Sequence, residues 1–181
     1  MNRIKLHDKY FRLFIPNEKI EESIINVAQK LNRDYRNIPN PLFLSVLNGS
    51  FMFSAHLMKY LDFNSEISFV RLSSYSGTST TGEVKQMLGF DRPLKGRHVI
   101  ILEDIVDTGG TVVELYNMMK KQQVADVKIC TLLLKPEAYQ YSGKISIDYA
   151  ALEIPNDFIV GFGLDYDELG RNFKDIYVLD K

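Results

Sequence analysis

The sequence predicts an α/β fold in which a doubly wound, mainly parallel sheet is flanked by helices. Three observations carry this prediction: short apolar runs recur along the chain, amphipathic segments of helical length separate them, and glycine-bearing turns follow several of the runs. In such a fold the carboxyl ends of the parallel strands meet at one edge of the sheet, and ligands bind there. Residues that directly follow the strands are therefore the first candidates for a functional site.

The size and composition of the chain exclude several classes of protein. It has 181 residues, 45% of them apolar and 25% charged, which is typical of a globular protein and fits one domain over residues 1–181. The formal net charge of −1 gives no general attraction for nucleic acid or an anionic membrane. No apolar run approaches the roughly 20 residues of a membrane span, and residues 1–9 lack the apolar core of a signal peptide. With Cys130 as its single cysteine, we expect a cytoplasmic protein.

The first third of the chain predicts two helices with a strand between them. A helix is predicted to start at Asn17 as its N-cap and to run through Leu31, because apolar residues recur there at helical spacing: Ile20, Ile24, Val27, Ala28 and Leu31. A strand is predicted over residues 42–47. The turn Asn48-Gly49-Ser50 joins it to a second helix that ends near Leu61.

The remaining elements outside the central motif are predicted in the same way. A strand over residues 67–72 leads into residues 73–85, whose glycine and hydroxyl content is typical of a surface loop. Another strand over residues 127–134 ends at Lys135-Pro136. Residues 154–166 contain two glycines and, considered alone, indicate a core strand with bends.

The most informative motif follows the apolar, β-branched run Val99–Leu102. Two adjacent acids, Glu103 and Asp104, come directly after it; then Asp107-Thr108-Gly109-Gly110-Thr111 precedes a helix predicted from Val112 to about Gln122. Backbone N–H groups of a glycine-rich turn, together with the positive end of a helix dipole, bind phosphate. Carboxylates at a strand end suit a magnesium ion or sugar hydroxyls. The motif therefore predicts a site for a phosphorylated ribose.

Each part of this motif also has a structural explanation. Asp-Thr is an ordinary helix N-cap and Gly-Gly an ordinary turn. Two adjacent carboxylates after a core strand are harder to explain structurally, because burying unpaired charge is costly. The ordered combination of apolar strand, acid pair, two apolar residues and Asp-Thr-Gly-x-Thr resembles the phosphoribosyl pyrophosphate signature of the type I phosphoribosyltransferases.

The resemblance is closest to the hypoxanthine and hypoxanthine–guanine branch of that family, and its motifs run from Leu47 to Arg171, about two-thirds of the chain. It implies the type I phosphoribosyltransferase fold, with a small hood formed by the terminal segments. The implied reaction is a Mg²⁺-dependent transfer of 5-phosphoribose from phosphoribosyl pyrophosphate to N9 of hypoxanthine or guanine in purine salvage, giving IMP or GMP. The resemblance also implies a homodimer or homotetramer.

By this resemblance, the strand-end motif binds the phosphoribosyl group through Glu103, Asp104, Asp107, Thr108, Gly109, Gly110 and Thr111. The turn holds the 5-phosphate, the acid pair holds the ribose hydroxyls directly or through Mg²⁺, and Asp107 is the general base at the purine. Leu47, Asn48 and Gly49 bind pyrophosphate with Arg171, and the Leu47–Asn48 peptide bond is expected to be cis. Family members often carry Lys or Arg where this chain has Asn48.

The resemblance assigns the purine pocket to Lys135, Phe158, Ile159 and Asp165. Lys135 would donate to the purine O6, Phe158 would stack on the base, and backbone groups of Ile159 would contact the base edge. Asp165 would approach the metal, so that the expected metal residues are Glu103, Asp104 and Asp165. Ser74 and Tyr75 resemble the start of the family's mobile lid, which would exclude water during transfer.

Two other classes of protein share parts of this pattern. Some members of the superfamily bind phosphoribosyl compounds but act as RNA-binding regulators of pyrimidine genes; the absence of a Lys/Arg stripe favours the enzyme. A phosphoacceptor receiver domain also has an acid pair and a strand-terminal Lys-Pro. It needs a further acid-bearing strand and a Ser/Thr-bearing strand between them, whereas residues 105–134 leave room for one helix and one strand. We therefore expect small-molecule substrates and no nucleic acid or membrane partner.

Overall fold

The computed structural model describes residues 3–73, 85–86 and 93–180. Its main sheet has five strands, all parallel, in the order β4-β3-β7-β8-β9. The bounds of these strands are β3 Leu42–Val46, β4 Glu66–Val70, β7 His98–Val106, β8 Asp126–Leu134 and β9 Tyr149–Glu153. The predicted doubly wound α/β fold is confirmed.

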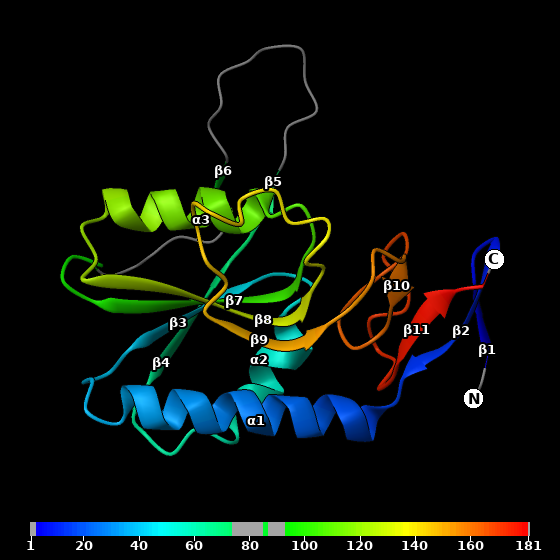
Figure 1. The fold of residues 1–181 in the computed structure, drawn as a ribbon, viewed down its shortest axis with the longest axis horizontal. Coiled ribbons are helices and arrows are strands. Elements are labelled where there is room, and N and C mark those ends of the chain that lie inside the picture. The colour runs from blue at the N-terminus through cyan, green and yellow to red at the C-terminus, as the bar shows by residue number, and fades with distance from the viewer. Residues whose placement is uncertain (1–2, 74–84, 87–92, 181) are drawn as a thin grey trace, which may run out of the picture.

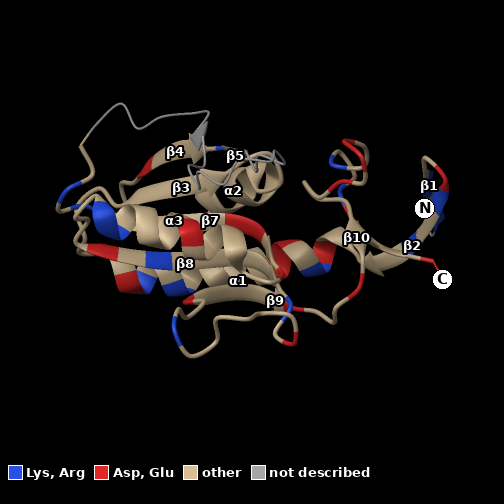
Figure 2. Ribbon diagram, turned by 90° about the horizontal axis from the view of Figure 1, so that it is seen from above, with Lys and Arg blue, Asp and Glu red and all other residues tan. Residues whose placement is uncertain are grey.

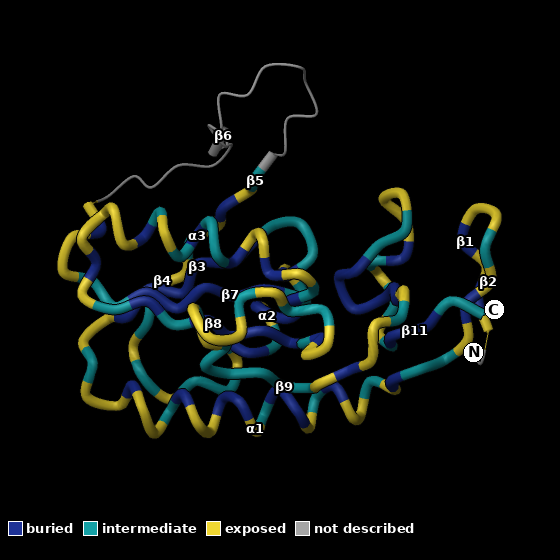
Figure 3. Tube along the Cα trace, turned by 45° about the horizontal axis from the view of Figure 1, so that its top comes forward, coloured by how far each residue is buried: buried dark blue, intermediate teal, exposed yellow. Residues whose placement is uncertain are grey.

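Helices cover both faces of the main sheet. The helices α1, Asn17–Tyr35, and α2, Phe51–Met58, lie on one face, and α3, Gly110–Lys121, lies on the other (Figure 1). Alternate residues of β7 pack on opposite faces: Ile100 and Leu102 join the core under α1 and α2, whereas Ile101 joins the core under α3. The central strands are buried along most of their length (Figure 3). Burial on both faces explains why the strands appear in the sequence as continuous apolar runs.

The two ends of the chain form a second, antiparallel sheet, which we call the terminal sheet. Its order is β1-β2-β11-β10, with bounds β1 Arg3–Leu6, β2 Lys9–Ile15, β10 Ile159–Val160 and β11 Ile176–Leu179. It has its own small core around Phe11 and Tyr177. It lies beside the main sheet near β10 (Figure 1). That it acts as a hood over bound substrate stays a prediction. A short pair, β5 Leu72–Ser73 with β6 Lys85–Gln86, follows β4.

Several predicted boundaries were wrong by a few residues. The helix α1 has Pro16 at its N-cap and extends to Tyr35, while α2 ends at Met58. The N–H of Asn17, in the first turn, donates to Asp175 Oδ1 (2.8 Å), an acceptor 158 residues away. The sequence did not predict β9, and of residues 154–166 only Ile159–Val160 form a strand. The long-range partners that set these boundaries are invisible to local sequence patterns.

The largest difference concerns β7, which was expected to end at Leu102. It continues to Val106 and pairs with β8 throughout, with Glu103 opposite Thr131 and Ile105 opposite Leu133. The apolar residues Ile105 and Val106 carry the strand past the acid pair. Glu103 therefore lies within the sheet, in a more buried position than a strand end would give it.

Charged residues are distributed over the strands of the main sheet and over the helices that cover it. Blue and red segments are interspersed along the described elements (Figure 2). None of the described helices combines the length and the apolar character that crossing a bilayer would need.

Candidate active site

The acid pair lies in an unusual environment for carboxylates. Glu103 is only 7% exposed, and its Oε2 has no hydrogen-bond partner among the described residues. Burial raises the pKa of Glu103 well above its ordinary value, and the neighbouring carboxylate of Asp104 raises it further. A buried carboxylate oxygen without a partner is rare in native proteins, and it is free to accept a hydrogen bond or to bind a cation.

Asp104 is fitted against the loop that follows β3. A Cβ added at Gly49 would lie 1.7 Å from Asp104 Oδ2, so only glycine leaves room for the carboxylate. Burial raises the pKa of Asp104 to about 6, while hydrogen bonds from the N–H groups of Ile105 and Asp104 and the positive charge of Arg171 lower it. The acid therefore releases its proton close to neutral pH.

This raised pKa predicts a pH-dependent stability. The folded chain binds the Asp104 proton more tightly than the unfolded chain does, so the free energy of unfolding falls as pH rises from about 4 to above 6. The free energy of unfolding of Asp104→Asn should not fall in this way. We therefore expect the difference in this free energy between the variant and the unchanged chain to shift in favour of the variant by up to about 3 kcal/mol between pH 4 and 7.5. Urea unfolding at both pH values, with a chelator present, measures the difference. The exposed Asp62→Asn is the control, and an equal pH dependence in all three proteins would contradict the prediction.

The glycine-rich turn forms a small cavity with the start of α3. The helix begins at Gly110, and its N-cap Gly109 has a φ of 92°, a conformation that favours glycine. The cavity has a volume of about 180 Å³, and its lining includes most of the predicted phosphoribosyl residues: Glu103, Asp107, Thr108, Gly109, Gly110 and Thr111. The N-terminus of α3 therefore faces a space in which an anion would meet backbone N–H groups.

Asp107 connects this turn to the end of β8. Lys135 Nζ donates to Asp107 Oδ2 over 2.7 Å, and the backbone N–H of Lys135 donates to Val106 O. Lys135 is 7% exposed, whereas the Asp107 side chain is half exposed. The ion pair holds the ammonium group and the carboxylate side by side at the edge where β7 and β8 end.

The loop between β3 and α2 is held by buried serines that the sequence analysis did not single out. The Leu47–Asn48 peptide bond is cis, as the resemblance implied. Ser50 Oγ donates to Val46 O (2.6 Å), and Ser45 Oγ lies 2.7 Å from both Ser50 Oγ and Ser54 Oγ. Because Ser50 gives its proton to Val46 O, Ser45 must donate to Ser50, and Ser54 to Ser45. The three hydroxyls thus tie the strand and the helix to the loop.

Arg171 closes the opposite side of this loop. Its guanidinium donates to Gly163 O (2.9 Å) and pairs with Asp165 Oδ1 (2.8 Å), while Asp165 Oδ2 accepts from the N–H of Glu168. A Cβ added at Gly163 would lie 2.1 Å from Gly49 O. Gly163 therefore packs directly on the β3–α2 loop, and its carbonyl holds Arg171 on this side of the loop.

Phe158 directly precedes β10 of the terminal sheet, and Ile159 is the first residue of that strand. Phe158 is 45% exposed although it is a large aromatic residue, and its ring contacts those of Phe11 and Tyr166. Ile159 is buried in β10, opposite Val178. An exposed aromatic face supported from behind suits stacking on a flat ligand. The stacking roles of these residues stay predictions.

The structure does not gather all the predicted residues equally. In the part of the chain that it describes, no three His, Cys, Asp or Glu side chains lie close enough to hold a metal ion. Asp165 in particular is engaged by Arg171. The expected metal set of Glu103, Asp104 and Asp165 therefore stays a prediction. Ser74 and Tyr75, the expected lid residues, lie outside the described residues.

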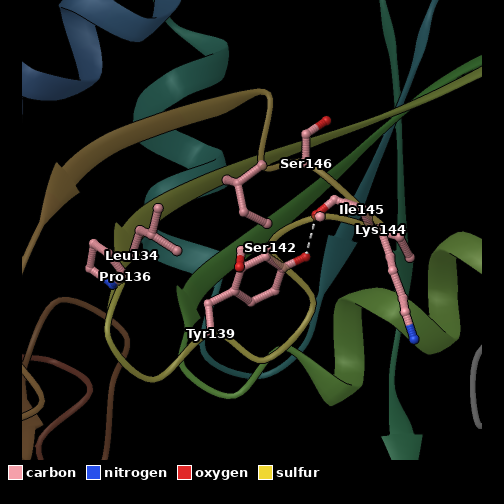
Figure 4. A pocket seen from close by; sticks show the side chains of 9 residues that line it. Leu134, Pro136, Tyr139, Ser142, Lys144, Ile145 and Ser146 are labelled. Carbon is pink, nitrogen blue, oxygen red and sulfur yellow. Dashed lines mark hydrogen bonds between the residues drawn. The ribbon is translucent and has the colours of Figure 1, made fainter.

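A larger cavity, of about 530 Å³, lies beside the glycine-rich turn. It is formed by the end of β8 and the segment that leads to β9 (Figure 4), and its lining includes Leu134, Pro136, Tyr139, Ile145 and Ile147. Its surface is mainly apolar and contains none of the predicted site residues. Tyr139 lines this cavity, and its ring also packs against Gly109 in the glycine-rich turn.

Comparisons with known proteins agree with this geometry. The family described as "Phosphoribosyl transferase domain" matches residues 15–167. A hypoxanthine-guanine phosphoribosyltransferase of Streptococcus pyogenes is 47% identical over 154 residues, 84% of each chain. The enzyme of the same name from Streptococcus thermophilus is 42% identical over 93% of this chain and 92% of the relative. A solved hypoxanthine phosphoribosyltransferase of Trypanosoma cruzi, a mutant in a ternary substrates complex, has a TM-score of 0.84 and 39% identity, over 93% of this chain and 94% of that one.

Proposed function

Since this chain belongs to the phosphoribosyltransferase family, we propose that it transfers 5-phosphoribose from phosphoribosyl pyrophosphate to N9 of a 6-oxopurine, releasing pyrophosphate. The enzyme is a hypoxanthine–guanine phosphoribosyltransferase of purine salvage, as its relatives over most of both chains are. One observation of the site carries the proposal furthest. An acid of the pair, Glu103, and a helix N-terminus line the same small cavity, as a sugar bearing a phosphate requires.

The proposed roles follow from the chemistry of each group. Backbone N–H groups of residues 108–111 bind the 5-phosphate, and the acid pair accepts hydrogen bonds from the ribose hydroxyls. Asp107 takes the proton that N9 loses as it attacks C1 of the ribose. Lys135, held by Asp107, donates to the purine O6, and an ammonium group there disfavours the amino group of adenine.

The leaving pyrophosphate needs positive charge, which the β3–α2 loop lacks because Asn48 is neutral. The proposed donors are the loop N–H groups around Gly49 and the guanidinium of Arg171, which suits bidentate anion binding. Arg171 donates to Gly163 O, and Gly163 packs against that loop. Little covalent chemistry thus falls to the protein, and positioning and electrostatics do most of the work.

The residues present fit a magnesium ion. Glu103 Oε2 is buried without a partner among the described residues, and the charge of the neighbouring Asp104 acts on the Glu103 carboxylate. Mg²⁺ prefers such oxygen ligands and takes the rest of its shell from water and phosphate groups. When bound, the ion neutralises charge on the pyrophosphate group. Glu103 and Asp104 would hold it, with Asp165 as the third proposed residue.

A direct assay tests the proposed function. Purified protein is incubated with phosphoribosyl pyrophosphate, MgCl₂ and hypoxanthine, guanine, xanthine or adenine in parallel, and the nucleotide and pyrophosphate formed are measured. We expect IMP, and GMP with guanine, with little or no AMP. Nucleotide formation that persists with a chelator would contradict the metal dependence. Absence of any nucleotide would overturn the proposal, and RNA binding would then favour the regulatory alternative.

Lys135→Ala tests the purine assignment. We expect the KM for hypoxanthine to rise at least about tenfold and the preference over adenine to fall by a similar factor, because the charged donor to O6 is lost. The KM for phosphoribosyl pyrophosphate should change much less. Lys128→Ala is the matched control, because Lys128 lies in β8, the strand that Lys135 directly follows, and its ammonium pairs with Asp148. Unchanged base selectivity would remove Lys135 from the purine site.

Two further proposals rest on family membership. One is a cytoplasmic location, and the other is assembly into a homodimer or homotetramer. Size-exclusion chromatography with light scattering measures the second directly, and a monomer at micromolar concentration would contradict it.

A further inference from the structure

The phosphate-binding turn is closed on one side by a tyrosine. A Cβ added at Gly109 would lie 2.3 Å from Tyr139 Cε2 and 3.3 Å from Tyr141 Cδ2. A Cβ added at Gly110, the next residue, would meet nothing within 4 Å. The turn is therefore open at Gly110 and backed by an aromatic ring at Gly109.

Two hydrogen bonds fix this ring relative to the turn. Tyr139 Oη donates to Ile145 O (2.7 Å), a bond visible in Figure 4 across the segment that follows β8. The backbone N–H of Gln140 donates to Thr108 O (3.2 Å), inside the turn itself. The ring is thus anchored at its hydroxyl, and the adjoining backbone is bonded directly to the turn.

The large cavity lies on the far side of the same ring. Tyr139 lines this cavity of about 530 Å³, so close packing does not hold the ring from that side. Burial also raises the pKa of the Tyr139 hydroxyl, so it keeps its proton and donates to Ile145 at neutral pH. The hydroxyl bond therefore adds to the other restraints on the ring, which are the backbone bond from Gln140 to Thr108 and the ring contact with Tyr141.

We propose that Tyr139 is a positioning residue for 5-phosphate binding: its ring holds Gly109 at positive φ, so that the N–H groups of the turn converge on one anion. The φ of 92° at Gly109 is one of several values open to glycine, and a wall on one side restricts the choice. Preorganised donors bind an anion without an ordering cost at the moment of binding. The inference rests on the proposed function only in naming ribose 5-phosphate as the anion.

The experiment compares Tyr139→Leu with Tyr139→Phe. We expect Tyr139→Leu to raise the KM for phosphoribosyl pyrophosphate and the Kd for ribose 5-phosphate at least about tenfold, because the turn loses its wall. The Kd for pyrophosphate, measured by the same calorimetric titration, should stay within about threefold, since that anion is proposed to bind the β3–α2 loop. Tyr139→Phe keeps the ring and should recover most of the lost affinity.

The matched control is Tyr149→Leu. Tyr149 is also half-buried and bonded through its hydroxyl, to Asp34 Oδ2 on α1, so its loss tests general destabilisation. If Tyr139→Leu does not fold, Tyr139→Met, whose unbranched flexible side chain adapts to the space, gives the same comparison. Unchanged ribose 5-phosphate affinity in a folded variant would overturn the inference, and so would equal losses for pyrophosphate. If the unchanged protein binds ribose 5-phosphate but forms no nucleotide, the proposed function fails while this inference is still tested.

Discussion

Asp107→Asn is expected to lower kcat at least about 100-fold, the range in which general base catalysis contributes. The amide is nearly the same size as the carboxylate but cannot accept a proton from N9. The substitution also leaves the buried ammonium of Lys135 without its anionic partner, so we expect a smaller rise, about threefold to tenfold, in the KM for the purine. Steady-state kinetics with each substrate varied in turn separates the two effects.

The split between kcat and KM distinguishes a base from a positioning carboxylate. If Asp107 accepts the proton, Asp107→Asn lowers kcat far more than it raises either KM, whereas loss of a positioning carboxylate alone would change the KM values as strongly. Asp62→Asn, an exposed site on the α2–β4 connection, should behave as the unchanged enzyme does. A kcat within about threefold of the unchanged enzyme would remove Asp107 as the base.

Gly49→Ala is expected to abolish most of the activity, with a loss in kcat/KM of at least about 100-fold. The added methyl group would overlap Asp104 Oδ2, so the carboxylate or the loop must move. Either movement displaces a group that the reaction is proposed to need, and small displacements of catalytic groups cost rates of this order. The conformation of Gly49 itself is not the obstacle, since its φ is not positive.

Gly143→Ala is the matched control for this substitution. A Cβ at Gly143 would meet nothing within 4 Å, and its φ is likewise not positive, so that variant should keep its activity. The double variant of Gly49→Ala and Asp104→Asn tests whether steric overlap or charge causes the loss of activity. In it the added methyl group still overlaps the side chain at position 104, although that side chain no longer carries a charge. Full activity in Gly49→Ala would show that the loop adapts and that the close fit has no catalytic role.

The parts of the site that the sequence predicted are those encoded within a few residues. The acid pair, the turn at residues 107–111 and the helix after it form one continuous motif, and the structure places most of them around one cavity. The resemblance to the family predicted the cis Leu47–Asn48 peptide bond, which the composition of the loop does not predict. Local sequence patterns predict these features because the residues that form them are close along the chain and stay close in the fold.

The parts that could not be predicted depend on contacts between distant segments. No local pattern near Asn17 predicts that Asp175 accepts a hydrogen bond from its N–H. Likewise, no local pattern near Gly109 predicts that the ring of Tyr139 packs against it. The extension of β7 past Glu103 follows from pairing with β8, which a single-strand pattern does not contain. The buried serines had a faint signal, since Ser45 interrupts an otherwise apolar strand, but its partners are known only from the fold.

The order of the terminal sheet has a consequence for how the protein is made. The strand β2 leaves the ribosome long before its inner neighbour β11, which the whole main sheet separates from it along the chain. Until that later strand is synthesised, Phe11, fully covered in the finished molecule, has no Val160 or Tyr177 to shelter it. The nascent chain therefore carries β2 without its later partner strand during that interval, and an unpaired strand with an uncovered phenylalanine favours aggregation.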